Sequence, residues 1–307
     1  MFIGTELQGV IDALEVGEKY RSTDDKTFEI GVDVLPDFPK DTTDRNRTSP
    51  FAFTGNKFEF RMLGSADSIS CTNTIINTIV AEELCQIADQ LEGSADFTND
   101  LKKLLAKIIT EHKAIIYNGN GYSEEWLEEA VNVRHLPNLV STVDALPEYI
   151  TPKSVALFEK FKVYTEAELR ARTEVLLENY SKVLNIEALT MLEIVKRDII
   201  PACLKYTKEI CDTGASKQAM GIDSGLEKEL AGKLSDLTKG IYRETALLEE
   251  KVIAAQDKEN GLPMARFYRD EVFAQMQTLR AIVDETETNF SEEYWPLPSY
   301  TKLLFTV

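Results

Sequence analysis

The spacing of hydrophobic residues changes once along the chain, near residue 65. Before it, residues 27–34 (TFEIGVDV) and 56–62 (NKFEFRM) alternate apolar and polar side chains, the period-two pattern of β-strands. A short amphipathic helix is expected ahead of them, at residues 4–17. After residue 65, apolar residues recur every three or four positions, which is typical of helices. The sequence therefore predicts an α+β protein, with a short β part followed by a mainly helical region.

Three long helices are predicted after residue 160. The first, residues 165–200, opens with the capping box TEAE and has no glycine or proline before Pro201. The second, residues 224–258, keeps apolar residues at three- and four-residue intervals from Leu226 onward. The third, residues 264–287, follows a proline that suits the first turn of a helix. Each apolar stripe needs a partner, so we expect an antiparallel bundle without a sheet.

The segment KFEFR places Lys57, Glu59 and Arg61 on one face of a strand and Phe58 and Phe60 on the other. We expect the two rings to be buried. The charged row is either a solvated face whose charges pair across the sheet, or a binding face. One or two strands do not form a stable sheet, so the partner strands come from another chain, or Met1 is an internal start in a longer reading frame.

Charge and cysteine content narrow the possible partners and compartment. Fifty-two acidic against 34 basic residues give a formal net charge of -18, which disfavours nucleic acid and anionic lipid surfaces as partners. No apolar stretch is long enough to span a bilayer, and no export signal is visible. The four cysteines form no C-x-x-C motif, which is typical of thiols in a reducing compartment. We therefore expect a cytoplasmic protein that binds neither nucleic acid nor membrane.

Common catalytic motifs are absent from the sequence. There is no phosphate-binding P-loop, no G-x-G-x-x-G, no H-E-x-x-H and no G-x-S-x-G. The two histidines, His112 and His135, lie in polar surroundings and are expected to be structural or solvated. What remains is a basic segment, residues 44–61, within a strongly acidic chain. Such a local cationic pocket suits an anionic small molecule.

Several segments resemble one known family. Residues 39–62, PKDTTDRNRTSPFAFTGNKFEFRM, are similar to the segment near the end of the catalytic domain of type III glutamine synthetases. Residues 118–131, 158–172 and 185–206 resemble the helical C-terminal region of that family. The resemblance implies that residues 1–92 are the C-terminal part of the catalytic domain and residues 93–307 the helical C-terminal region. It also implies that Met1 is a truncated start.

The family resemblance implies a role for each charged residue of the basic segment. Glutamine synthetases transfer the γ-phosphoryl group of ATP to glutamate, and ammonia then displaces phosphate, with Mg²⁺ or Mn²⁺ bound. By resemblance Glu59 is a ligand of the metal and Arg61 binds the carboxylate of glutamate. Arg47 and Lys57 contact ATP phosphates, although many relatives outside the type III group carry arginine where Lys57 stands. Arg45 is expected to be structural.

The resemblance also implies a homo-oligomer of stacked rings for the full-length protein. Two other functions stay open: a helical oligomerisation module without catalysis, and a related carboxylate–amine ligase with a different amine acceptor. A two-metal site needs several carboxylate or imidazole ligands, and only Glu59 lies in a matching motif. The isolated chain is therefore expected to be inactive.

Overall fold

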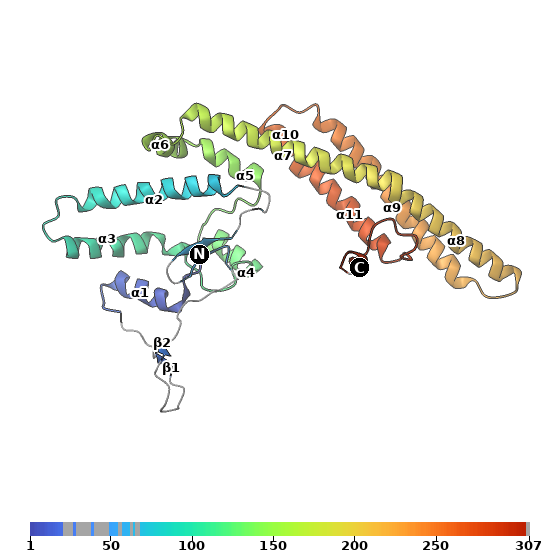
Figure 1. The fold of residues 1–307 in the computed structure, drawn as a ribbon, viewed down its shortest axis with the longest axis horizontal. Helices are drawn as coiled ribbons and strands as arrows, with labels where there is room; N and C mark the ends of the chain where they lie inside the picture. Colours follow the sequence, from blue (N-terminus) through green and yellow to red (C-terminus); the bar gives the residue numbers. More distant parts are fainter. Residues whose placement is uncertain are drawn as a thin grey trace. The chain divides into compact units, whose positions relative to one another are not determined.

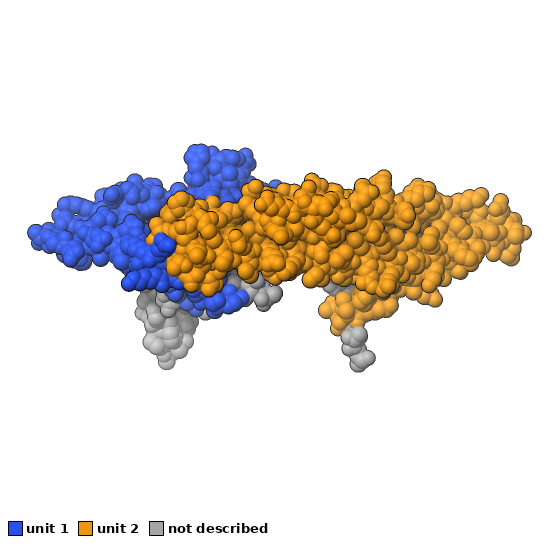
Figure 2. Space-filling model, turned by 90° about the horizontal axis from the view of Figure 1, so that it is seen from above, with its two compact units in different colours: residues 1–139, 157–163 blue, residues 140–156, 164–307 orange. Residues whose placement is uncertain are grey.

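The computed structural model describes residues 1–20, 27–28, 38–39, 49–54, 57–61, 64 and 68–304. The chain divides into two compact units, coloured separately in Figure 2: unit 1 comprises residues 1–139 and 157–163, and unit 2 comprises residues 140–156 and 164–307. The described residues combine long helices with two small antiparallel sheets, which confirms the α+β class. The division into two units does not test the predicted domain boundary at residue 92, which stays a prediction.

Unit 1 contains short strands and helices. Its elements in chain order are α1 (Gly4–Val16), β1 (Thr27–Phe28), β2 (Phe38–Pro39), β3 (Phe51–Phe53), β4 (Phe58–Phe60), α2 (Ile69–Leu91), α3 (Phe97–His112), the 3₁₀ turn η1 (Lys113–Ile115), α4 (Glu124–Glu128) and the π-helix η2 (Glu129–Val133). Helix α6 (Pro152–Lys160) begins in unit 2 and ends in unit 1. The expected helix at residues 4–17 is confirmed; most of the expected strand at residues 27–34 lies outside the described residues.

Three helices of unit 1, α2, α3 and α4, begin at side-chain caps that the sequence makes available. The side chains of Ser68, Asp96 and Ser123 each accept a hydrogen bond from a backbone N–H in the first turn of α2, α3 and α4. Gly93 follows α2 with φ of +79°, a left-handed conformation that glycine adopts without a steric penalty. Local sequence alone therefore fixes most of these helix ends.

Unit 2 is built from long helices that lie side by side (Figure 1). Its elements are α5 (Thr142–Ala145), the 3₁₀ turn η3 (Leu146–Ile150), α7 (Glu166–Ile194), the π-helix η4 (Val195–Ile199), α8 (Ile200–Ala219), α9 (Gly225–Ala255), α10 (Leu262–Phe267), the π-helix η5 (Tyr268–Phe273), α11 (Ala274–Glu287) and α12 (Tyr300–Leu304). Residues 165–290 are all described, and none of them is in a strand. The prediction of at least three long packed helices without a sheet is confirmed.

The first long helix extends beyond its predicted end. α7 begins at the predicted capping box, in which the side chains of Thr165 and Glu168 satisfy each other's backbone N–H groups. The helix does not stop at Pro201, because η4 widens the turn ahead of it and the N–H of Ile200 bonds to the carbonyl of Val195, five residues back. A proline lacks an N–H and crowds the preceding turn, and this π-turn accommodates it.

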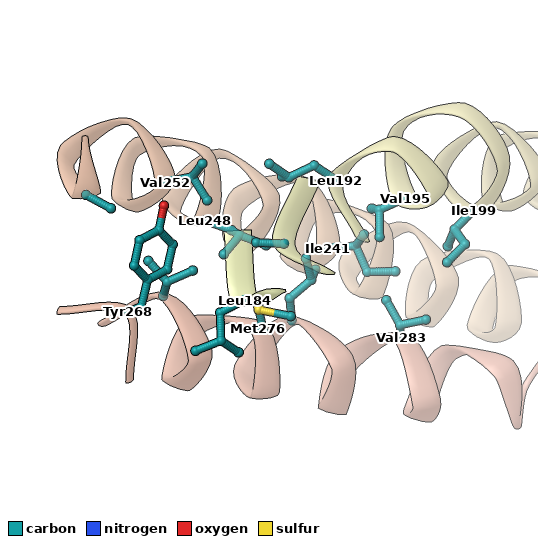
Figure 3. Close-up of a cluster of buried hydrophobic side chains, with 14 of the residues drawn as sticks. Leu184, Leu192, Val195, Ile199, Ile241, Leu248, Val252, Tyr268, Met276 and Val283 are labelled. Carbon is teal, nitrogen blue, oxygen red and sulfur yellow. The ribbon is translucent and has the colours of Figure 1, made fainter. Parts of the chain in front are cut away.

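The main core of unit 2 lies where three helical segments meet (Figure 3). Side chains from α7 with η4, from α9 and from η5 with α11 point toward one another; those labelled in the figure are Leu184, Leu192, Val195, Ile199, Ile241, Leu248, Val252, Tyr268, Met276 and Val283. Five of the eight buried positions of α9 recur at intervals of seven: Glu227, Leu234, Ile241, Leu248 and Ala255. A seven-residue repeat keeps one face of a helix against its neighbours, as in coiled coils.

One apolar position of α9 was assigned to the wrong face. Leu226 is 62% exposed, whereas its neighbour Glu227 is 8% exposed and lies on the seven-residue repeat. Glu227 is accommodated because Lys217 of α8 forms an ion pair with its carboxylate, and Gly214 leaves room for its Cβ. The hydrophobic pattern alone could not reveal this, because it scores a glutamate as solvent-facing.

Candidate active-site strand

The candidate site residues lie on the hairpin formed by β3 and β4. The strands are antiparallel, with Phe51 opposite Phe60, Ala52 opposite Glu59 and Phe53 opposite Phe58. At the turn, the backbone N–H of Thr54 donates to the carbonyl of Lys57 at 2.8 Å. At the open end, the N–H of Arg61 donates to the carbonyl of Pro50 at 2.8 Å. The predicted strand is confirmed, and both of its ends are fixed by backbone hydrogen bonds.

Glu59 and Arg61 lie on the same face and contact each other. Nε and Nη2 of Arg61 are 3.2 and 2.9 Å from the same oxygen, Oε2 of Glu59. Arg61 Nη1 also donates to the carbonyl of Ser49 at 3.4 Å. The hydrogen bond from Arg61 holds the pKa of Glu59 below its ordinary value, and smaller contributions come from Thr54 and Lys57. The carboxylate is therefore ionised at neutral pH, as a metal ligand must be.

The prediction that Phe58 and Phe60 are buried is wrong. Phe58 is 54% exposed and Phe60 45% exposed. Their rings contact only part of the neighbouring strand: the Phe51 ring lies 5.5 Å from that of Phe58 and 6.3 Å from that of Phe60, centroid to centroid. On the opposite face Ala52 is completely buried.

The physical reason is that alternation determines which side chains share a face, but not which face the rest of the chain covers. In this hairpin the aromatic face is the exposed one. The face with Ala52, Glu59 and Arg61 is partly covered, so the side chains of Glu59 and Arg61 are 38% and 22% exposed. Lys57, at the turn, is exposed.

Two other residues of the basic segment, Arg45 and Arg47, lie outside the described residues. Among the described residues, no three histidine, cysteine, aspartate or glutamate side chains lie close enough together to hold a metal ion. Glu59, the expected metal ligand, therefore belongs to no such group in the described part of the chain. His112 and His135 are both exposed.

Sequence reasoning missed two residues that hold the backbone of unit 1 in place, Asn118 and Arg134. Asn118 accepts hydrogen bonds from the backbone at the start of α1, through Oδ1 at 3.1 Å from the N of Ile3 and 3.0 Å from the N of Gly4. Arg134 lies over the ring of Trp126 and donates to two backbone carbonyls. No local signal marks Asn118, because it and its partners are more than 100 positions apart, and the carbonyls that Arg134 binds are 18 and 20 positions away.

Comparison with known proteins shows which family the sequence of this chain resembles. A family model described as the glutamine synthetase C-terminal domain matches residues 100–218. A glutamine synthetase of Butyrivibrio fibrisolvens is 33% identical over 100% of this chain and 44% of its own length. A type-3 glutamine synthetase of Dictyostelium discoideum is 32% identical over 99% of the chain and 43% of its own length. A glutamine synthetase of Bacteroides fragilis is 31% identical, with 100% and 44% covered.

These similarities define the class of protein that the chain resembles: it is similar over its whole length to glutamine synthetases, and residues 100–218 match their C-terminal domain. More particularly, it is related to type III glutamine synthetases and corresponds to a C-terminal part of such a protein. The chain spans about 44% of the length of the curated relatives that it matches. Within the described residues, no helix is both long and apolar enough to cross a bilayer.

Proposed function

We propose that this chain supplies part of the active site of a cytoplasmic glutamine synthetase, which joins ammonia to glutamate through γ-glutamyl phosphate at the expense of ATP. The observation that carries the proposal is the position of Glu59 and Arg61 on one partly covered face of a strand, within a segment that resembles the family's catalytic domain. The similarity of the whole chain to glutamine synthetases supports it.

Glu59 is proposed to be a ligand of Mg²⁺ or Mn²⁺ on the nucleotide side. Both ions prefer carboxylate oxygens, and the lowered pKa keeps this carboxylate charged. A single carboxylate fits such an ion only as one ligand of about six, so the others would come from elsewhere in the complete protein. When bound, the ion neutralises charge on the phosphates during transfer. Because Arg61 contacts Oε2, Glu59 would bind the ion through its other oxygen or by exchanging that contact.

Arg61 is proposed to bind the carboxylate of glutamate. A guanidinium is a planar donor that can bind a carboxylate through two parallel hydrogen bonds. In this structure Nε and Nη2 of Arg61 both donate to a single oxygen, Oε2 of Glu59. Lys57, on the same strand edge and exposed, would contact an ATP phosphate as a point charge. Arg47 is assigned to ATP phosphates by resemblance alone.

The test is ATP-dependent glutamine formation by the 307-residue chain, by the complete protein that carries these residues, and by variants of the latter. Glu59→Ala should reduce turnover by about 100-fold or more, the scale expected for one lost electrostatic contribution. Arg61→Lys should mainly raise KM for glutamate, because a point charge replaces a fork of donors. Glu83→Ala, at an exposed glutamate of α2, is the matched control.

Three results would contradict the proposal. These are robust turnover by the 307-residue chain alone, a Glu59→Ala enzyme indistinguishable from wild type, and a KM for glutamate unchanged by Arg61→Lys. Replacing ammonia by larger amines in the same assay separates a glutamine synthetase from a related carboxylate–amine ligase. Faster product formation with such an amine would favour the related ligase.

A second role, in assembly, is favoured by the surface of α7. On the side opposite its buried residues, α7 exposes an apolar stripe formed by Val175, Leu176, Val183, Ile186 and Leu189. Exposed stripes of this length are typical of surfaces that contact another protein. We propose that the stripe contacts the same stripe of a second copy of this chain, as one contact of the homo-oligomer.

Charge complementarity supports a second copy of this chain as the partner of the stripe. If two α7 helices pair antiparallel about the midpoint between Lys182 and Val183, Leu176 lies opposite Leu189 and Arg172 lies opposite Glu193. Arg172 stacks over the ring of Tyr164, at 4.4 Å from its centroid, and so is held at the edge of the stripe. Glu193 pairs with Arg197 one turn away, an exposed contact that is readily exchanged.

A charge swap tests this contact. Sedimentation of the chain should show concentration-dependent dimers. Arg172→Glu should weaken dimerisation because it places two carboxylates opposite each other, and adding Glu193→Arg in the same chain should restore it. Arg170→Glu, at an exposed site off the stripe, is the control. A chain that stays monomeric, or a double variant as weak as the single one, would overturn the pairing.

A further inference from the structure

The hairpin that carries Glu59 has a third strand-like neighbour in the first residues of the chain. The N–H of Phe2 donates to the carbonyl of Phe51 at 3.0 Å, and the N–H of Phe53 donates to the carbonyl of Phe2 at 2.8 Å. Phe2 is thereby bridged in parallel to Ala52, whose other neighbour in the sheet is Glu59. Phe2 and Ala52 are 2% and 0% exposed. A shift in the backbone of Phe2 would therefore shift Ala52 and, through it, Glu59.

Asn118 fixes these first residues where they turn into α1. Its Oδ1 accepts the N–H groups of Ile3 and Gly4, and its Nδ2 donates to Oε1 of Gln8 at 3.2 Å. α1 has no side-chain cap of its own at Ile3, so Asn118 takes that role from a distant part of the chain. Gly4 has φ of +79°, which a residue with a Cβ rarely adopts. The turn from strand to helix is thus fixed by conformation and by hydrogen bonds.

The segment that bears Asn118 is itself held in place. The N–H of Tyr117 donates to the carbonyl of Met1 at 2.9 Å. Nη1 of Arg134 donates to the carbonyls of Ala114 and Ile116 at 3.0 and 2.7 Å, and its guanidinium lies 4.9 Å from the ring centroid of Trp126. The Trp126 and Tyr117 rings stack at 4.0 Å. These contacts make residues 114–118 a firm support.

We infer that Asn118 is a positioning residue for Glu59 and Arg61, acting through residues 2–4 and β3. This inference rests on the proposed function. The hydrogen bonds run from Asn118 to Ile3 and Gly4, and the adjoining Phe2 is paired to β3, which is paired to β4. A displacement of about 1 Å in a catalytic group can reduce activity by about 100-fold. Activity should therefore depend on how Phe2 is paired with β3. Asn118 lies inside the family-matched segment 100–218, and so links that helical region to the catalytic strand.

The test compares Asn118→Leu, which loses both acceptor bonds, with Asn118→Asp, which keeps an oxygen acceptor for both N–H groups. In the 307-residue chain, Asn118→Leu should speed amide hydrogen exchange at Phe53 by about tenfold or more. In the complete protein it should lower kcat/KM for glutamate by about 10- to 100-fold. Asn118→Asp should restore most of both quantities. Asn99→Leu, at an exposed asparagine of α3, is the control and should change neither.

The possible results separate this inference from the proposed function. Unchanged exchange at Phe53 in Asn118→Leu, or an aspartate variant as impaired as the leucine variant, would overturn the positioning role. Faster exchange together with a fully active Glu59→Ala enzyme would overturn the proposed function, and the catalytic meaning of the positioning with it. If Asn118→Leu does not fold, Asn118→Ser, whose hydroxyl is too short to reach both N–H groups, takes its place in the same comparison.

Discussion

Arg61 directs two N–H groups at a single oxygen of Glu59, with Nε and Nη2 at 3.2 and 2.9 Å from Oε2. The two side chains proposed to bind a metal ion and a substrate carboxylate are thus partners of each other. An ion pair that is still partly open to solvent, as this one is, contributes little to stability and exchanges readily. The pair therefore keeps both charges in place on one face of β4 without preventing either from binding its own ligand.

The first prediction concerns the pKa of Glu59. Because the hydrogen bond from Arg61 is the largest cause of its lowering, Arg61→Ala should raise this pKa toward the ordinary value of 4.5. Lys57→Ala should raise it much less, since Lys57 makes the smallest contribution. The measurement is an NMR titration of the Glu59 side-chain carboxyl carbon in each variant. Equal shifts in the two variants would contradict the assignment of Arg61 as the main partner.

The second prediction compares two glycines in long helices. A Cβ at Gly214 of α8 would lie 3.0 Å from the Cβ of Glu227, whereas a Cβ at Gly232 of α9 would meet nothing within 4 Å. Gly232→Ala should therefore stabilise the protein by roughly 0.5–1 kcal/mol through helix propensity. Gly214→Ala should destabilise it by about 1 kcal/mol or more, because the helices must move apart. Urea unfolding followed by circular dichroism measures both; a stabilising Gly214→Ala would show that the contact is loose.

The third prediction concerns pH and the buried Glu244. Its Oε2 accepts a hydrogen bond of 2.8 Å from Gln275, and this bond is the main reason why the pKa of Glu244 is lowered. A carboxyl with a lowered folded-state pKa contributes stability above its unfolded-state value of about 4.5, and that contribution is lost as the pH falls through the folded-state value. Gln275→Met should therefore cost about 2 kcal/mol at pH 7 and progressively less below pH 4.5.

Urea unfolding at a series of pH values checks this expectation. Gln277→Met, which changes an exposed glutamine two positions further along α11, is the control and should show no such pH dependence. A penalty for Gln275→Met that is constant with pH would mean that the loss comes from packing and not from the charge of Glu244.

The fourth prediction concerns Arg134. Lysine cannot reproduce its two hydrogen bonds to the carbonyls of Ala114 and Ile116 while also pairing with Glu129. Arg134→Lys should destabilise unit 1 by about 1–2 kcal/mol and change the fluorescence of Trp126, over whose ring the guanidinium lies.

The control is Arg170→Lys, which changes an exposed arginine that pairs with Glu166 one turn away. It should leave both stability and fluorescence nearly unchanged, because such surface pairs contribute little. Thermal unfolding and emission spectra supply the measurements. An unaltered emission spectrum in Arg134→Lys would contradict the stacking on Trp126.

Much of the site could be predicted from the sequence, but the residues that support it and the face that is covered could not. The alternation in KFEFR was enough to place Glu59 and Arg61 on one face of a strand, and their contact follows from being two residues apart. The exposure of Phe58 and Phe60 could not be foreseen, since it depends on which face the rest of the chain covers. The role of Asn118 was equally hidden, because a side chain that caps a helix from 114 positions away leaves no periodic signal.

The sequence by itself determined the α+β class, the start of α7 and the existence of three long helices, because these depend on a local cap and on a repeating apolar stripe. Only the tertiary structure decided the continuation of α7 through η4 and Pro201 into α8, and the burial of Glu227 in place of Leu226. It also decided how the hairpin with Glu59 is joined to Asn118. Each of these depends on a neighbour distant in sequence, or on a backbone adjustment that a one-dimensional pattern does not contain.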